Sequence, residues 1–158
     1  MIQIILILTI LACGLIAGVF YSYSCSVNPG LKNLSDTGYL QSMQQINRAI
    51  LNPVFFASFM GTLILLPLST WLGRGHLSST QFYYFLAASI IYIIGAFGVT
   101  IAGNVPLNEA LDRFDISSAT TEQIKLHRQQ FESKWNQLHL IRTLASVASF
   151  LLVILGSR

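Results

Sequence analysis

The sequence has few charged residues. Only 9% of its 158 residues are Asp, Glu, Lys or Arg, whereas 53% are hydrophobic. A typical soluble domain is about 25% charged, so this composition excludes an ordinary soluble domain and predicts an integral membrane protein. The net charge of +3 is dispersed, and no run of Lys or Arg occurs. Nucleic acid is therefore not an expected partner.

Cysteine and histidine are also scarce. The two cysteines, Cys13 and Cys25, would lie about 18 Å apart on one helix, too far for a disulfide between them. Of the three histidines, His76 lies in a short polar turn, and His127 and His139 are about 18 Å apart along one expected helix. These residues form no paired haem site, and no Gly-rich phosphate loop is present. We therefore expect no cofactor and no metal.

Four apolar stretches are long enough to cross a membrane, for which about 20 residues are needed. They cover approximately residues 2–27, 54–72, 82–102 and 138–155. Backbone polar groups in lipid must be satisfied within each segment, so these stretches are expected to be helices. The sequence predicts an all-α fold, a four-helix transmembrane bundle that forms a single domain over residues 1–158. The first stretch lacks a preceding basic region and is expected to stay uncleaved.

The connectors between these spans differ in length. Residues 73–81 form a short Gly-rich turn, whereas residues 28–53 and 103–137 form two long connectors on the opposite membrane face. Both long connectors contain amphipathic helical patterns, and the second is expected to start at Thr120 or Thr121 and continue into the fourth span. In the first connector, one broad face is made of Leu40, Met43, Ile46, Asn47, Ile50 and Leu51. The positive-inside count favours a cytoplasmic location for the long connectors, in a bacterial inner membrane.

The first span carries small residues every four positions, at Gly14, Gly18, Ser22 and Ser26. Such a stripe is typical of close helix packing in membranes. We therefore expect this face of the first span to contact a neighbouring helix.

The segment "WNQLHLIRT" (residues 135–143) takes polar residues into the fourth span. The apolar run that follows is too short to cross alone, so the span must begin near residue 138. Trp135, Asn136, His139, Arg142 and Thr143 are spaced by three, four and seven residues, which places them on one helical stripe. Ionisable residues inside a membrane mark functional sites by default. We predict that this stripe faces the bundle interior.

The other three spans also place polar residues at this membrane face. These are Asn104 and Asn108 after the third span, Asn47, Arg48 and Asn52 before the second, and Ser22, Ser26 and Asn28 at the end of the first. We expect the four helix ends to enclose a shared polar pocket. The structural alternatives are that each asparagine caps a helix and that Arg142 extends to the headgroup region.

Four segments taken together resemble a known family. They are "GVFYSYSCSVNPGL", "MQQINRAILNPVFF", "GVTIAGNVPLNEAL" and "WNQLHLIRTLAS", within residues 11–152. The chain is similar to the anthrone-oxygenase-like membrane proteins, whose bacterial members are mostly described as a domain of unknown function. The resemblance implies that dioxygen oxidises an anthrone to an anthraquinone without a bound cofactor. The matching positions are Asn47, Arg48, Asn52, Asn104, Pro106, Asn108, Trp135, Asn136, His139, Arg142 and Thr143.

The leading hypothesis is a membrane oxidoreductase that oxidises a lipophilic phenolic or quinone-like substrate with dioxygen in a polar pocket at one membrane face. His139 is the predicted general base, Arg142 and Asn136 complete the catalytic group, and Arg142 or Arg48 stabilises an oxyanion together with asparagine amides. The predicted substrate-binding residues are Asn47, Arg48, Asn52, Asn104, Asn108, Trp135 and Thr143.

A non-enzymatic function explains the same polar cluster. The alternative hypothesis is a lipid- or quinone-binding membrane protein, or an assembly subunit, that uses this pocket without chemistry. The expected partners under either hypothesis are the lipid bilayer and a lipophilic aromatic or quinone-like molecule. Homo-oligomerisation stays open.

Overall fold

The computed structural model describes residues 2–158, and it is built from helices. Four helical columns are long and apolar enough to cross a membrane, which confirms the all-α transmembrane bundle. The first joins α1 (Ile2–Ser22), the π-helical segment η1 (Tyr23–Val27) and α2 (Asn28–Lys32). The second is α4 (Pro53–Gly73). The third joins α5 (Ser79–Ile91), η2 (Tyr92–Gly98), η3 (Thr100–Asn104) and α6 (Val105–Asp112), and the fourth is α7 (Thr121–Gly156). A shorter helix, α3 (Asp36–Ala49), links the first two columns.

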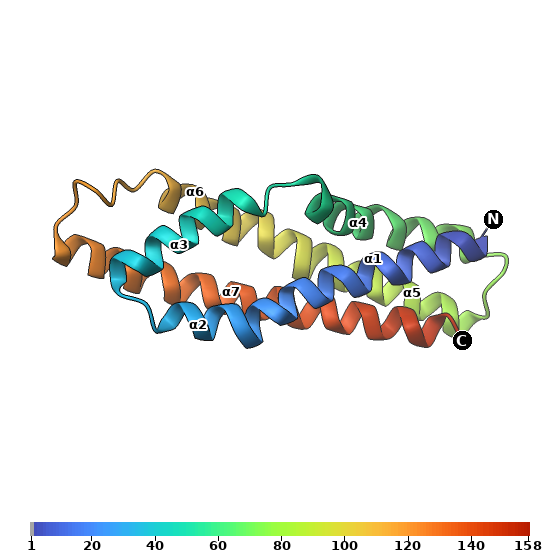
Figure 1. The fold of residues 1–158 in the computed structure, drawn as a ribbon. Coiled ribbons are helices and arrows are strands. Elements are labelled where there is room, and N and C mark those ends of the chain that lie inside the picture. Colours follow the sequence, from blue (N-terminus) through green and yellow to red (C-terminus); the bar gives the residue numbers. More distant parts are fainter. Residues whose placement is uncertain (1) are drawn as a thin grey trace.

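The columns pack as a ring of antiparallel neighbours. Helix α1 packs against α4 and α7, and α5 packs against the same two helices from the opposite side of the ring. Both chain ends and the short α4–α5 connection lie at one end of the bundle, while α2, α3 and α6 lie at the other (Figure 1). The two long connectors therefore share one face, as the sequence predicts.

The bundle contains two hydrophobic cores along its length. The first lies among the four columns and is made of Cys13, Ile16, Phe20, Phe59, Leu66, Phe85, Ala88, Tyr92, Ala96 and Val153. The second joins α2, α3, α6 and the beginning of α7, and is made of Leu31, Tyr39, Leu40, Met43, Leu111, Ile116, Ile124, Phe131 and Trp135.

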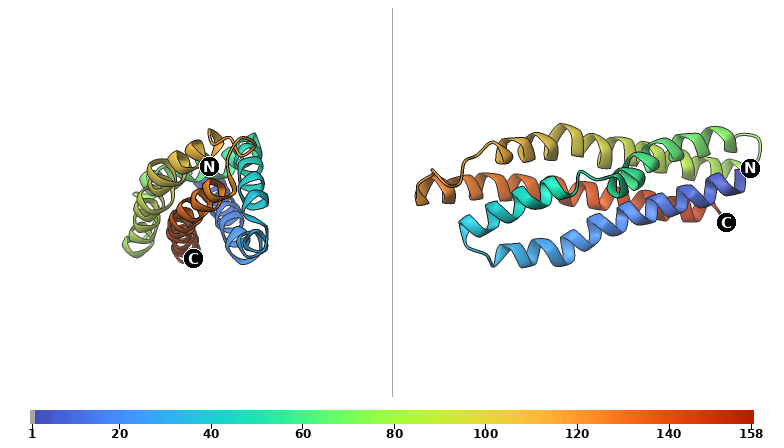
Figure 2. Two further views of the ribbon diagram at one scale, coloured as in Figure 1. Left: turned by 90° about the vertical axis from the view of Figure 1, so that its left-hand side faces the viewer. Right: turned by 45° about the horizontal axis from the view of Figure 1, so that its top comes forward.

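Helix α7 connects the two cores because it is longer than a bilayer is thick. Its 36 residues correspond to about 54 Å, whereas the hydrocarbon core of a bilayer is about 30 Å thick. The N-terminal part of α7 therefore projects beyond the hydrocarbon and packs beside α3 and α6 (Figure 2). The boundary between the two cores falls near residues 135–142 of this helix.

Side-chain caps fix where the helices begin. Thr120 accepts a hydrogen bond from the backbone N–H of Gln123, whose side chain accepts one from Thr120 in return. This capping box confirms the expected start of the last helix at Thr120, and the helix continues unbroken into the membrane. Ser78 begins α5 in the same way, and Asn52 caps α4 ahead of Pro53.

Two expectations about helix faces are wrong. The small-residue stripe of the first span packs closely only at Gly14, where an added Cβ would lie 3.1 Å from the Phe150 ring. Gly18, Ser22 and Ser26 are exposed, and a Cβ added at Gly18 would meet nothing within 4 Å. The inward face carries larger residues instead, namely Thr9, Ala12, Cys13, Ile16, Ala17 and Phe20. Leu51, expected on the buried face of the first connector, follows the end of α3 and is 66% exposed.

Candidate functional site

His139 lies at the boundary between the two cores, with 1% of its surface exposed. Its Nδ1 accepts a hydrogen bond of 3.0 Å from Nε of Arg142, three residues further along α7. Its Nε2 lies 3.0 Å from the hydroxyl of Ser24. Because Nδ1 is an acceptor, the neutral imidazole carries its proton on Nε2 and donates it to Ser24. Both ring nitrogens are therefore engaged.

Ser24 is a member of this site that the sequence did not identify. It lies on η1, and its hydroxyl is also 3.3 Å from that of Thr143. The sequence analysis expected Ser22 and Ser26 on the inner face by α-helical spacing, but both are exposed. A π-helical turn has i→i+5 hydrogen bonds and shifts side chains relative to α-helical spacing, and such turns are frequent at functional sites. The only sequence signal for Ser24 was that serine and tyrosine are frequent in residues 21–26.

Aromatic rings enclose the imidazole and the guanidinium. The ring of Trp135 stacks on His139, with centroids 4.9 Å apart and planes at 14°. Tyr23 and Phe20 approach the imidazole edge-on, at 5.2 and 6.0 Å. The Arg142 guanidinium carbon lies 4.5 Å from the centroid of Phe20 and 5.0 Å from that of Trp135. These two contacts stabilise the guanidinium, because a cation is attracted to the face of an aromatic ring.

Arg142 keeps its positive charge without a carboxylate partner. It is 8% exposed, and no salt bridge joins it to any acidic residue among residues 2–158. The Nε of Arg142 donates to His139. Its two terminal nitrogens donate no hydrogen bond to any of residues 2–158. A buried cation with free donors favours a ligand that brings an acceptor or a negative charge.

A small, partly open cavity lies beside these groups, and we call it the inner cavity. Its volume is about 60 Å³. It is lined by Val19, Phe20, Tyr23, Ile46, Asn47, Ile50, Phe55, Asn108, Trp135, His139 and Arg142. These residues come from all four columns and from the α3 region, so parts of all four columns line one cavity.

Asparagines connect α7 to the other helices around the inner cavity. Asn108 accepts a hydrogen bond of 2.7 Å from the indole N–H of Trp135. Asn104 is fully buried and donates to the backbone oxygen of Trp135 at 3.3 Å. The amide nitrogen of Asn47 is buried without a hydrogen-bond partner among the described residues. Asn47 therefore has a donor free for a ligand.

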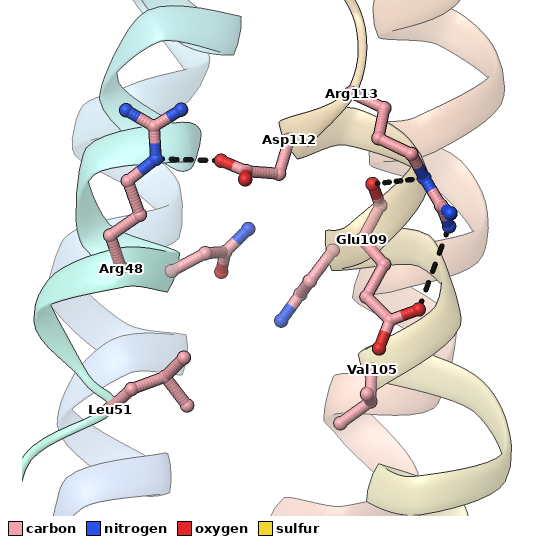
Figure 3. Close-up of a pocket in the computed structure, with 8 residues that line it drawn as sticks. Arg48, Leu51, Val105, Glu109, Asp112 and Arg113 are labelled. Atoms are coloured by element: carbon pink, nitrogen blue, oxygen red, sulfur yellow. Dashed lines mark hydrogen bonds and ion pairs between the residues drawn. The ribbon is translucent and has the colours of Figure 1, made fainter.

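A wider hollow adjoins the inner cavity between α3 and α6, and we call it the outer cleft (Figure 3). Its volume is about 380 Å³, and it is lined by Asn47, Arg48, Leu51, Val105, Asn108, Glu109, Asp112 and Arg113. Arg48 on α3 and Asp112 on α6 form an ion pair of 2.7 Å across it. Asn47 and Asn108 line both hollows, so these two residues form the boundary between them.

The structure does not bring every predicted residue to these hollows. Asn52 caps α4 by accepting from the N–H of Phe55 and donates to the backbone oxygen of Ala49. Asn136 is half-buried with its amide oxygen unpartnered among residues 2–158. In the part of the chain that the structure describes, neither residue lines the inner cavity or the outer cleft. Thr143 lies next to His139 and donates to its backbone oxygen at 2.7 Å.

Metal-ligating side chains do not converge in the described part of the chain. No group of three or more His, Cys, Asp or Glu residues there could hold a metal ion. The residues that meet at the site are instead an imidazole, a guanidinium, two carboxamides and aromatic rings.

Comparison with known proteins gives one family. A family model described as anthrone oxygenase matches residues 42–152. The match contains the predicted site residues from Asn47 to Thr143, whereas Tyr23 and Ser24 precede it. No curated protein and no solved structure matches the chain.

Proposed function

The chain belongs to the anthrone oxygenase family, and from this premise we propose that it is a membrane oxidoreductase that oxidises a lipophilic phenolic or anthrone-like substrate with dioxygen. The observation that supports this proposal is the pair of adjoining hollows that share Asn47 and Asn108. One has the size of a small-molecule pocket, and the other contains a buried imidazole and guanidinium.

The outer cleft suits the aromatic substrate. Small-molecule pockets typically measure about 300–1,000 Å³, and the outer cleft measures about 380 Å³. Leu51 and Val105 supply apolar contacts, and the Arg48 guanidinium with the amides of Asn47 and Asn108 supplies groups for a phenolic oxygen. A flat substrate would enter from the interfacial region and place its reacting edge at the boundary between the hollows.

The chemistry needs one proton acceptor and a stabilised anion. Removal of a proton from the central ring of an anthrone gives an electron-rich anion whose charge rests largely on oxygen. His139 is the proposed base, and Arg48 with the neighbouring amides would stabilise the oxyanion. Since Nδ1 of His139 accepts from Arg142, the base function requires Arg142 to release this nitrogen when the substrate is bound.

Oxygen uptake by the purified protein tests the proposal. The protein in detergent is mixed with an anthrone, and dioxygen consumption is recorded together with the absorbance of the quinone. We expect uptake and quinone formation in equal amounts, above the rate of the same mixture with heat-denatured protein. A protein that retains an anthrone or a quinone but does not accelerate oxygen uptake would instead be a binding protein.

The finer localisation is also a proposal. We propose that α3, α6 and the start of α7 lie on the cytoplasmic side of a bacterial inner membrane, the orientation that the positive-inside count favours. Single cysteines introduced at Ser117 and at Gly75, in a background without Cys13 and Cys25, would report the two faces. Labelling of intact cells by an impermeant maleimide should modify the cysteine at position 75 and not that at position 117.

A further inference from the structure

The inner cavity is too small for the substrate that the outer cleft accommodates. Its volume of about 60 Å³ has room for only a few water-sized molecules, far less than a drug-sized pocket of about 300–1,000 Å³. It is only partly open and is lined by the charged Arg142. A ligand of two or three heavy atoms is the size that fits.

The polar groups around this cavity offer free donors, and two of the acceptors are already used. The terminal nitrogens of Arg142 and the amide nitrogen of Asn47 have no partner in the described part of the chain. The acceptors Nδ1 of His139 and Oδ1 of Asn108 are already bound, by Arg142 and by Trp135. No carboxylate lines the cavity among residues 2–158. A ligand that accepts hydrogen bonds, and above all an anion, therefore matches this lining.

The remaining walls are apolar. Val19, Phe20, Ile46, Ile50 and Phe55 surround the same space. An uncharged diatomic molecule fits such walls, and the guanidinium becomes important only when negative charge develops on it. Interactions that strengthen as charge develops are those that accelerate a reaction.

We propose that the inner cavity is the dioxygen subsite and that Arg142 stabilises the superoxide formed there. This inference rests on the proposed function. The deprotonated substrate transfers one electron to dioxygen, which leaves a substrate radical and superoxide. The two combine by forming a carbon–oxygen bond, and the resulting peroxide takes up a proton. Loss of water then breaks the O–O bond and the remaining C–H bond at that carbon, leaves a quinone carbonyl, and requires no other reductant.

Filling the cavity tests this assignment. Val19→Phe and Ile50→Phe each add volume at the cavity wall, and Val54→Phe makes the same change as the first on a residue that is 82% exposed on α4. We expect either cavity variant to raise KM for dioxygen about tenfold while KM for the anthrone changes less than about twofold. Val54→Phe should change neither. An unchanged KM for dioxygen in both cavity variants would overturn the proposal.

A small anion provides an independent measurement. Azide should inhibit competitively against dioxygen and not against the anthrone, and its infrared band should shift on binding to the protein. Arg142→Met and Val19→Phe should both abolish the shifted band, whereas Val54→Phe should retain it. Competition against the anthrone alone would overturn the assignment.

The infrared measurement separates failure of this inference from failure of the proposed function. If no anthrone is oxidised by the unaltered protein, the proposed function fails, but azide binding that depends on Val19 and Arg142 still supports a subsite for small acceptor ligands. If anthrone is oxidised and no band shift appears at any azide concentration that inhibits, the dioxygen subsite is not in this cavity.

Discussion

Arg142 donates a hydrogen bond from Nε to Nδ1 of His139, and the distance between the two nitrogens is 3.0 Å. The bond fixes the tautomer of the imidazole and the plane of the guanidinium at the same time. It also fixes which donors of Arg142 stay free, because Nε is used and the terminal nitrogens are not. Two residues on one helical stripe therefore behave as one unit, and their substitutions should not be additive.

Two amide replacements of His139 separate its roles. Asn at this position offers an oxygen near Nδ1 and can keep the bond from Arg142, whereas Gln reaches toward Nε2 and Ser24. Neither amide takes up a proton, so we predict that both His139→Asn and His139→Gln lower kcat by about 10²–10⁴. Oxygen uptake and thermal unfolding in detergent measure activity and folding. Near-normal turnover in His139→Asn would show that the imidazole only positions Arg142.

The bond between Trp135 and Asn108 is predicted to couple α7 to α6. Trp135→Phe leaves the Asn108 amide oxygen without its donor, and Asn108→Leu leaves the indole N–H without its acceptor. An unsatisfied buried group costs about 1–3 kcal/mol. Trp135 is 2% exposed and Asn108 is half-buried, so each single variant should unfold at lower denaturant concentration, and Asn108→Leu should lose more. The double variant should lose less than the sum of the two single losses, with a coupling of about 1 kcal/mol. Strict additivity would contradict the bond of 2.7 Å seen here.

The sequence predicted the fold well because the bilayer imposes strong constraints. Length and hydropathy located all four spans, and capping chemistry located the start of α7 at Thr120. The parts that the sequence did not predict depend on departures from α-helical geometry. The π-helical segments extend the first and third columns and change which side chains face inward. Ser24, and not Ser22 or Ser26, therefore reaches His139.

The candidate site was predictable where polar residues of one helix share a stripe and are also buried. His139, Arg142 and Trp135 share one stripe, and the spacing of these residues alone places them on one face of a helix. Asn52 shows the opposite case, because an asparagine before a proline at a helix start is also a standard cap, and the structure gives it that role. Asn47 is followed by Arg48 and not by a proline, so the sequence offers no capping role for it. Only tertiary packing shows that Asn47 faces both hollows.

Arg128 is predicted to stabilise the second hydrophobic core, the one among α2, α3, α6 and the beginning of α7, more than a lysine would at this position. Its guanidinium binds the carboxylates of Asp36 and Glu132 and the backbone oxygens of Lys32 and Leu34. Its side chain is 12% exposed. A lysine carries its donors on a single nitrogen and cannot reach all four acceptors at once, so Arg128→Lys should lower the free energy of unfolding by about 2–3 kcal/mol.

Arg113→Lys is the matched control for this substitution. Arg113 pairs with Glu109 on the same helix at 3.6 Å, and its side chain is 76% exposed. Exposed pairs of this kind contribute about 0–1 kcal/mol, so the control should unfold like the unaltered protein. The absence of any loss in Arg128→Lys would show that Arg128 acts only through its charge, which lysine retains.

Removal of the Tyr39 hydroxyl is predicted to stabilise the protein. Its ring is 1% exposed and its hydroxyl is buried without a hydrogen-bond partner in the described residues. Tyr39→Phe removes this unsatisfied group and keeps the ring beneath the Arg128 guanidinium, 4.5 Å away. We expect a gain of about 1 kcal/mol in the free energy of unfolding, measured at neutral pH. A loss of that size would mean that the hydroxyl has a partner, such as bound water.

The same substitution should change the response to alkaline pH. Burial, with the Glu132 carboxylate as a second cause, raises the pKa of Tyr39 above its ordinary value. Because the pKa is raised in the folded protein, the hydroxyl contributes its full share to the free energy of unfolding at any pH below the unfolded-state pKa of about 10. This share is lost as the pH rises above about 10. The unaltered protein should therefore lose stability relative to Tyr39→Phe above about pH 10. Parallel profiles of unfolding free energy against pH would contradict the burial of this hydroxyl.

The ion pair between Arg48 and Asp112 is predicted to control access to the outer cleft rather than stability. The two side chains are 55% and 48% exposed, and pairs of this exposure contribute about 0–1 kcal/mol. Asp112→Asn should therefore leave the unfolding midpoint nearly unchanged. It also frees Arg48 from α6, so the guanidinium can turn toward a phenolic oxygen in the cleft (Figure 3). KM for the anthrone should fall about two- to fivefold with kcat little altered.

Glu109→Gln is the control, because it removes a carboxylate of the same cleft that pairs within α6 and not across it. A similar fall in KM for both variants would assign the effect to general electrostatics, and a rise in KM for Asp112→Asn would show that the closed pair shapes the binding surface.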